Sequence, residues 1–127
     1  MRHIPLLASC LLVGACCHTL SGCSGPPPVS TSMVEATVSG TVTINGKLAT
    51  EGEVEFDPAN YLRKMEPARR APISADGRYT IRTLLGQNIV RFVSFEEPTE
   101  RGMAYDSIEF DVKEGENTLD IRLPLNQ

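Results

Sequence analysis

Beyond position 23 the sequence contains no cysteine and no histidine, and the whole chain contains no tryptophan. The segment after position 23 therefore has no Ser-His-Asp or Cys-His catalytic group, and it offers no nitrogen or sulfur ligand for zinc. A glycine-rich phosphate loop and the common nucleic-acid motifs are also missing. We therefore expect a non-enzymatic protein with no cofactor, no metal and no nucleic-acid partner.

The charge of the chain also limits its partners. Residues 24–127 carry 11 Lys and Arg against 16 Asp and Glu, a formal charge of −5. A modest acidic excess favours solubility and argues against general binding of the folded part to nucleic acid or to anionic membranes. The length of 127 residues leaves room for one domain.

The N-terminal segment has the composition of a secretory signal. Met1, Arg2 and His3 make a short, weakly positive start, and residues 4–17 are almost all apolar or small. This run of about 14 residues is shorter than the roughly 20 that a transmembrane helix needs. A signal peptide over residues 1–22 is therefore predicted.

Residues 20–23, Leu-Ser-Gly-Cys, resemble the lipobox of bacterial lipoproteins. The resemblance implies that Cys23 is acylated on sulfur, for example with palmitate, and becomes the first residue of the mature chain after cleavage. By the same resemblance, Ser24 is compatible with sorting to the outer membrane. We therefore expect a protein of the bacterial cell envelope that is attached to a membrane through a lipid anchor.

Other interpretations of these cysteines stay open. Residues 13–16, Val-Gly-Ala-Cys, also fit the lipobox pattern, so Cys16 is the alternative to Cys23 as the modified residue. A disulfide of Cys23 with Cys16 or Cys17 is another interpretation in an oxidising compartment. An ordinary cleaved signal, which would release a soluble protein, is the third.

A change in composition follows the cysteine. Residues 24–33 contain three consecutive prolines among Gly, Ser and Thr. Such a segment cannot pack a core and tends to the extended polyproline II conformation. We therefore predict a disordered linker over residues 23–34 and a folded domain over residues 35–127.

From residue 35 onward, apolar and polar residues alternate with period two, which is typical of β-strands with one buried face. The alternation covers residues 38–44, 53–56, 78–82, 108–112 and 119–123. No segment has convincing helical periodicity. We therefore predict an all-β protein, an antiparallel β-sandwich of about seven strands.

Four further features refine this prediction. Turns are expected at the Asn-Gly pair of residues 45–46 and the Asp-Gly pair of residues 76–77. The run 89–95, apolar on both faces except at Arg91 and Ser94, predicts a central strand or one covered on its second side. A Gly-containing hairpin is expected at residues 114–117. Residues 59–71 are expected to form a long loop, which is sometimes functional.

Three segments carry a family resemblance: VSGTVTINGK at 38–47, GEVEF at 52–56 and ADGRYTI at 75–81. In this order they are similar to the carboxypeptidase regulatory-like, or transthyretin-like, domains common in short bacterial lipoproteins. Those domains open with a V-x-G-x-V-x-x-N-G strand and turn and later carry a D-G-x-[YF] hairpin. The resemblance covers about residues 38–95 and implies a prealbumin-like sandwich with no particular chemistry. The hydroxyisourate hydrolase branch is excluded because its active site depends on histidines.

The only basic cluster lies in the predicted long loop. The candidate interaction residues there are Tyr61, Arg63, Lys64, Arg69 and Arg70. Such a cluster can meet phosphate head groups or an acidic cell-surface polymer. A solvated loop without a partner is the simpler interpretation.

Carboxylates are the remaining route to catalysis, because a glycosidase needs two of them across a cleft. The candidates by count are Glu53 with Glu55, Glu96 with Glu97, and Asp106 with Glu109 and Asp111. Oxygen ligands for calcium occur at Glu114, Glu116 and Asn117 and in residues 96–100, although no D-x-D-x-D-G loop is present. Outward positions on strands give the same patterns without any function.

The anchor, the spacer and the missing catalytic residue types favour a lipid-anchored structural or interaction module that contacts an envelope protein or polysaccharide. A carbohydrate-binding module is the first alternative, and it requires Tyr61 and Tyr105 to be exposed together. An envelope hydrolase is the second. It requires an opposed pair of carboxylates within about 10 Å in a pocket.

Overall fold

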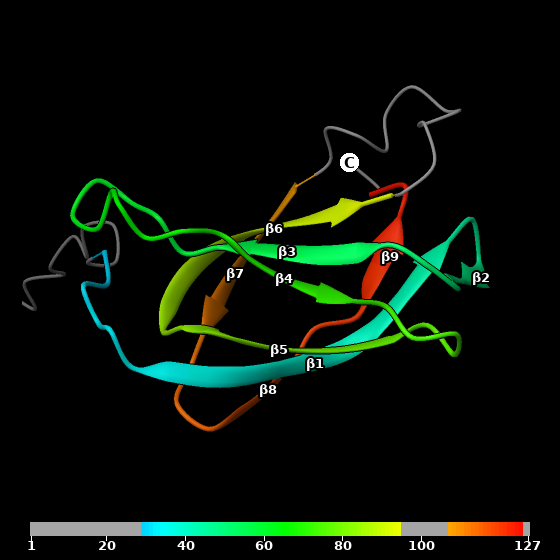
Figure 1. Ribbon diagram of the computed structural model, residues 1–127, viewed down its shortest axis with the longest axis horizontal. Helices are drawn as coiled ribbons and strands as arrows, with labels where there is room; N and C mark the ends of the chain where they lie inside the picture. The colour runs from blue at the N-terminus through cyan, green and yellow to red at the C-terminus, as the bar shows by residue number, and fades with distance from the viewer. Residues whose placement is uncertain (1–28, 95–106, 126–127) are drawn as a thin grey trace, which may run out of the picture.

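The computed structural model describes residues 29–94 and 107–125, and within these ranges every regular element is a β-strand. Two sheets pack face to face as a sandwich (Figure 1). The prediction of an all-β sandwich is confirmed. The strands are β1 (Glu35–Ile44), β2 (Lys47–Leu48), β3 (Glu53–Asp57), β4 (Arg69–Pro72), β5 (Arg78–Leu84), β6 (Gly86–Val93), β7 (Ser107–Val112), β8 (Glu116–Thr118) and β9 (Ile121–Leu123).

Strand β1 is the centre of the five-stranded sheet. Strands β5 and β2 pair antiparallel with one edge of β1, and β8 and β9 pair parallel with the other edge. The second sheet has the order β4-β3-β6-β7 and is antiparallel throughout. The predicted antiparallel arrangement therefore holds for every pairing of these strands except those of β8 and β9.

Alternate residues of the two sheets form one core. Val38 and Val42 of β1 are fully buried, as are Val54 and Phe56 of β3, in agreement with period two. The ring of Phe56 lies 6.2 Å from that of Tyr79 in β5, so an aromatic pair joins the sheets. Each such side chain contributes about 1.5–3 kcal/mol to folding through its burial.

The run at residues 89–95 behaves as predicted where it is described. Its residues up to Val93 belong to β6, which lies between β3 and β7 and is therefore a central strand. Ile89, Arg91 and Val93 face away from the core and remain half-buried. Among the described residues, the two neighbouring strands β3 and β7 account for the partial burial of this outward face.

The described residues form nine strands, whereas the sequence predicts about seven. The additions include β2 and β8, which have two and three residues and are too short for periodicity to detect. Strand β4 occupies the end of the predicted loop, so the loop proper ends before Arg69. Strand β4 has only four residues and few of them are apolar, so the sequence shows no clear alternation there.

The hairpin predicted at residues 114–117 is wrong. Strand β7 belongs to the four-stranded sheet and β8 to the five-stranded sheet, so the chain crosses from one layer to the other. The side chain of Asn117 stabilises the connection between the two sheets through hydrogen bonds to the backbone. Its Oδ1 accepts from the Lys113 N–H at 2.9 Å, and its Nδ2 donates to the Thr37 carbonyl at 3.2 Å. A buried amide thus replaces the backbone ladder that a hairpin would have.

Two residues of the family-like motifs meet at the backbone of Leu119. A Cβ added at Gly40 would lie 1.9 Å from the Leu119 carbonyl oxygen, so β1 passes this point only with glycine. The hydroxyl of Tyr79 donates to the same oxygen at 2.7 Å. Burial raises the pKa of Tyr79 well above its usual value, which keeps this donor protonated. Together these contacts fix the junction between β8 and β9.

The carboxylate of Asp120 completes this junction. Its Oδ1 accepts from the Thr41 N–H and from the Thr41 hydroxyl, each at 2.9 Å. These two hydrogen bonds hold the pKa of Asp120 below its usual value. The ionised side chain thereby satisfies a β1 backbone donor in the gap between β8 and β9.

This junction predicts a pH dependence. Because the folded-state pKa of Asp120 lies below the unfolded value of about 4, its contribution is present above that pH and is lost as pH falls through the folded pKa. Between about pH 5 and pH 3 the urea midpoint of the native chain should fall more than that of Asp120→Asn. Circular dichroism at each pH measures both midpoints. Parallel decline of the two proteins would contradict the assignment.

Candidate functional site

The predicted attachment residue lies outside the described residues. Cys23 and its alternative Cys16 both fall within residues 1–28, so the anchor stays a prediction from the sequence. Tyr105 and the acidic residues at 96–100 and 106 also lie outside the described residues. No helix in the part of the chain that the structure describes is long and apolar enough to cross a membrane.

The structure separates the five residues of the predicted interaction loop. Tyr61 and Lys64 are exposed in the segment 58–68, which connects β3 to β4. Arg69 and Arg70 belong to the edge strand β4. Arg63 is only 7% exposed. The expectation of one basic cluster on the surface is therefore wrong, because its members have different environments.

Arg63 is a structural residue of this region. Its Nε donates to the Pro58 carbonyl at 2.7 Å, its Nη1 to the Ser32 carbonyl at 2.7 Å and its Nη2 to the Leu85 carbonyl at 3.0 Å. Burial lowers the pKa of Arg63, and the nearby Glu66 carboxylate opposes this shift. An arginine remains charged under such conditions. The guanidinium thus ties together three separate stretches of backbone.

The arm formed by residues 29–34, assigned to the linker from the sequence, is held by this arrangement. Besides the bond from Arg63, the Asn60 side chain donates to the Ser30 carbonyl at 3.0 Å, and the Leu85 N–H donates to the Val34 carbonyl at 3.0 Å. A Cβ on Gly86 would lie 2.3 Å from the Cβ of Ser30. The arm therefore lies directly against the sandwich up to Ser30.

The other two arginines of the predicted cluster are neutralised by carboxylates. Arg69 Nη1 lies 3.0 Å from Glu35 Oε1, and Arg70 Nη2 lies 2.7 Å from Glu55 Oε2. Glu55 also lies 3.3 Å from Arg91 Nη1 on β6. Arg70, Glu55 and Arg91 form a row of alternating charge on one face of the four-stranded sheet, whereas Arg69 lies on the same side as Phe56 and pairs with Glu35 of β1 in the other sheet. The candidate pair Glu53 and Glu55 is therefore engaged with arginines.

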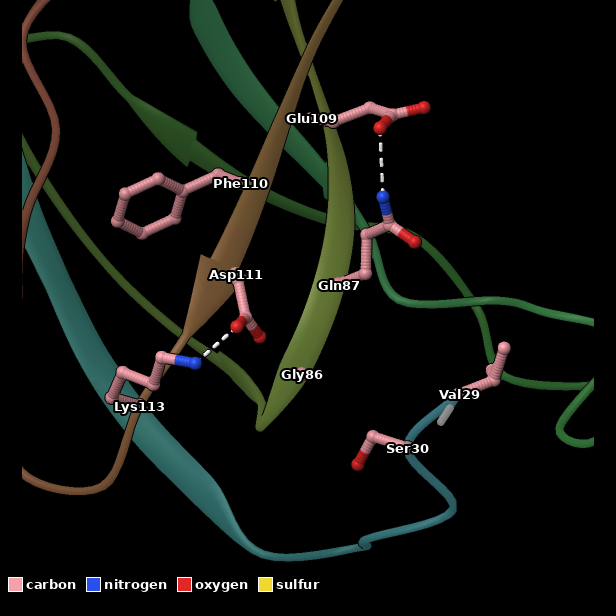
Figure 2. Close-up of a pocket in the computed structure, with 8 residues that line it drawn as sticks. All are labelled: Val29, Ser30, Gly86, Gln87, Glu109, Phe110, Asp111 and Lys113. Carbon is pink, nitrogen blue, oxygen red and sulfur yellow. Dashed lines mark hydrogen bonds and ion pairs between the residues drawn. The ribbon is translucent and has the colours of Figure 1, made fainter. Parts of the chain in front are cut away.

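A hollow of about 480 Å³ lies between the arm, β6 and β7 (Figure 2). Two carboxylates line it, and each has a partner: Glu109 accepts from Gln87 at 2.8 Å, and Asp111 pairs with Lys113. Both carboxylates come from β7. The arm contributes Val29 and Ser30 to the opposite side. The described lining therefore contains no pair of carboxylates facing each other.

The acidic segment at residues 114–117 is also accounted for by the fold. Asn117 is 8% exposed, and its amide is bonded to the backbone of the crossing between the sheets. Glu114 and Glu116 point to solvent. Within residues 29–94 and 107–125, no three acidic residues are grouped closely enough to hold a metal ion.

Sequence reasoning missed the structural roles of Arg63, Asn117 and Asp120, since it named Arg63 only as an interaction residue and Asn117 only as an oxygen ligand for calcium. The polar side chain of each residue forms a hydrogen bond with a backbone group that is distant in the sequence. The only signal in the sequence was the local surroundings: Asn117 follows the Gly-containing segment 114–116, and Asp120 occupies a polar position of an alternating strand. Such signals indicate a turn or a bend without naming the partner.

No protein-family model matches the chain, and no curated protein matches it in sequence. Among solved structures, the chain is similar to a DUF3823 family protein from Parabacteroides merdae ATCC 43184, with a TM-score of 0.54 and 14% identity, over 69% of this chain and 45% of that one. A DUF3823 family protein from Bacteroides ovatus ATCC 8483 is also similar, with a TM-score of 0.48 and 19% identity, over 70% of this chain and 43% of that one. This chain spans less than half the length of both structures. The first likeness supports the β-sandwich fold and says nothing of activity.

Proposed function

We propose that this protein is a lipid-anchored, non-enzymatic module of the bacterial cell envelope with a transthyretin-like sandwich. Its anchor is the acylated Cys23, with the outer membrane as its location. Its activity is to hold an interaction surface near the membrane, where an envelope protein or a polysaccharide is the partner.

The observation that carries the proposal is the course of the chain after Cys23. Val29 follows six residues later, so at about 3.3–3.6 Å per residue it lies no more than roughly 20 Å from the cysteine. From Ser30 the chain is fixed to the sandwich by Asn60 and Arg63. An anchor at Cys23 would therefore keep the sandwich close to the membrane surface.

The absence of a catalytic role is supported by what the carboxylates contact. Glu55 is bound to arginines, and Glu109 and Asp111 share one strand and have partners of their own. A hydrolase of the two-carboxylate type needs an opposed pair, one of them free to act as a base. Of the two tyrosines that a carbohydrate-binding face would use, Tyr61 is 65% exposed and Tyr105 lies outside the described residues.

The transthyretin-like resemblance is supported by the structural role of its motif residues. The glycine of the V-x-G-x-V strand is Gly40, and the aromatic of the D-G-x-[YF] hairpin is Tyr79. Both contact the Leu119 carbonyl. The motif spacing therefore has a physical reason in this fold: it secures the last strands of the five-stranded sheet.

Replacement of the predicted anchor residue tests the proposal. In cells that are fed a labelled palmitate analogue, Cys23→Ala should abolish incorporation of the label, because no other cysteine stands at the proposed attachment site. Cys16→Ala is the matched control and should be labelled like the native chain. Loss of label in Cys16→Ala with retention in Cys23→Ala would move the anchor to Cys16. Equal absence of label in all three proteins would overturn the proposal.

A further inference from the structure

The end of the sandwich at which the arm enters has an unusual surface, here called the apolar tip. It consists of Met33, Val34, Tyr61, Leu62 and Met65, whose exposed fractions run from 54% to 93%. In the described part of the chain, the only other large hydrophobic residue exposed to this degree is Leu48 in β2. Five exposed apolar side chains in two short segments need an explanation, because monomeric soluble proteins keep such patches small.

The two segments of the tip are held together by hydrogen bonds. Arg63 and Asn60, which flank Tyr61 and Leu62, bind the carbonyls of Ser32 and Ser30 next to Met33. The arm and the loop 58–68 accordingly lie at one end of the molecule, with β2 at the opposite end (Figure 1). The two segments that carry the exposed side chains therefore lie next to each other on a fixed backbone.

The charges of this region suit a contact with a polar-apolar boundary. Lys64 is exposed within the tip and makes no ion pair with any described residue. The other charged side chains of the loop are Arg63, which is turned inward, and the partly buried Glu66, whose carboxylate lies near the Arg63 guanidinium. Tyrosine, leucine and methionine around a single lysine are typical of segments that lie at the level of lipid head groups. The contact would be mainly apolar, so the net acidic charge of the chain does not oppose it.

We propose that the apolar tip inserts into the interface of the bilayer that holds the acylated Cys23. This inference rests on the proposed function, because the anchor brings the tip to the membrane: the arm that lies against the tip begins at Val29, within roughly 20 Å of Cys23. Insertion gives the molecule a defined orientation. The loop 58–68 faces the lipid, and the β2 end, with Leu48, points away and is presented to partners.

The absence of tryptophan from the chain permits a direct test of depth. Leu62→Trp and Leu48→Trp each introduce a single fluorophore, at positions that are both 54% exposed but lie at opposite ends of the sandwich. The acylated full-length proteins are reconstituted into vesicles of phosphatidylethanolamine and phosphatidylglycerol, with and without brominated acyl chains. Met65→Trp is a second tip variant, at a side chain that is 93% exposed and so tolerates replacement.

The proposal predicts that brominated lipid quenches the tip tryptophans by about half or more and shifts their emission to the blue, because interfacial side chains lie about 5–10 Å deep. The tryptophan at position 48 should show neither effect. If all variants sediment with the vesicles and carry the acyl group, but the tip tryptophans emit as in water, insertion is wrong and the anchor stands. If the chains carry no acyl group and stay in solution, the proposed function is overturned, and insertion with it.

Discussion

Gly40→Ala should lower the free energy of unfolding by about 3 kcal/mol or more, a large effect for a single methyl group. The added Cβ would lie 1.9 Å from the Leu119 carbonyl oxygen and 2.6 Å from its carbon. Both atoms are backbone, so no side-chain rotation relieves the overlap. The junction of β8 and β9 would have to move away from β1, which also disturbs the hydrogen bond from Tyr79 to that oxygen.

Gly115→Ala is the matched control for this prediction. Gly115 has a φ of 85°, and a Cβ there meets nothing within 4 Å, so the change adds backbone strain without a steric clash. That strain is expected to cost about 1–2 kcal/mol. Urea denaturation followed by circular dichroism measures both variants. If Gly40→Ala is no less stable than Gly115→Ala, the close approach of Leu119 to β1 is not as described.

Arg63→Met is the second substitution with a large expected effect, a loss of about 3 kcal/mol of stability. The variant keeps most of the apolar stem but loses three donors, leaving the carbonyls of Ser32, Pro58 and Leu85 without these partners. The arm should also be released from the sandwich. Limited proteolysis within residues 29–34 should therefore become faster than in the native protein, in addition to the lower urea midpoint.

The adjacent residue provides the control. Lys64→Met removes the same charge from an exposed position and should change stability by no more than about 0.5 kcal/mol. Arg63→Lys keeps the positive charge but loses the planar arrangement of donors, because one ammonium group cannot reach all three carbonyls. It should be nearly as unstable as Arg63→Met. Equal stability of the variants at positions 63 and 64 would show that the arm is held by other contacts.

The core of the fold could be predicted from the sequence because it depends on a local pattern. Period two correctly identified the inward positions of β1, β3 and β5, and the turn pairs lie where the chain reverses, with Asn45 and Gly46 at positive φ. Pairing between distant strands leaves no such local trace. The parallel docking of β8 and β9 against β1 depends on Gly40, Thr41 and Asp120 meeting in space.

The candidate site shows the same limit. A run that contains several basic residues predicts an exposed cationic loop, because most such residues are solvated. Which of them is buried depends on the backbone carbonyls that surround it, and those of Ser32 and Leu85 come from segments far from Arg63 in sequence. Composition also indicated that residues 29–34 would not pack. The hydrogen bonds from Asn60 and Arg63 override that tendency.

The central claim is that a lipid on Cys23 holds this sandwich at the membrane. Intact mass spectrometry of the protein purified from the membrane fraction tests it most directly. The account predicts a chain that begins at Cys23 and is heavier than its sequence by the mass of the attached acyl groups. A chain of unmodified mass recovered from the soluble fraction would contradict it.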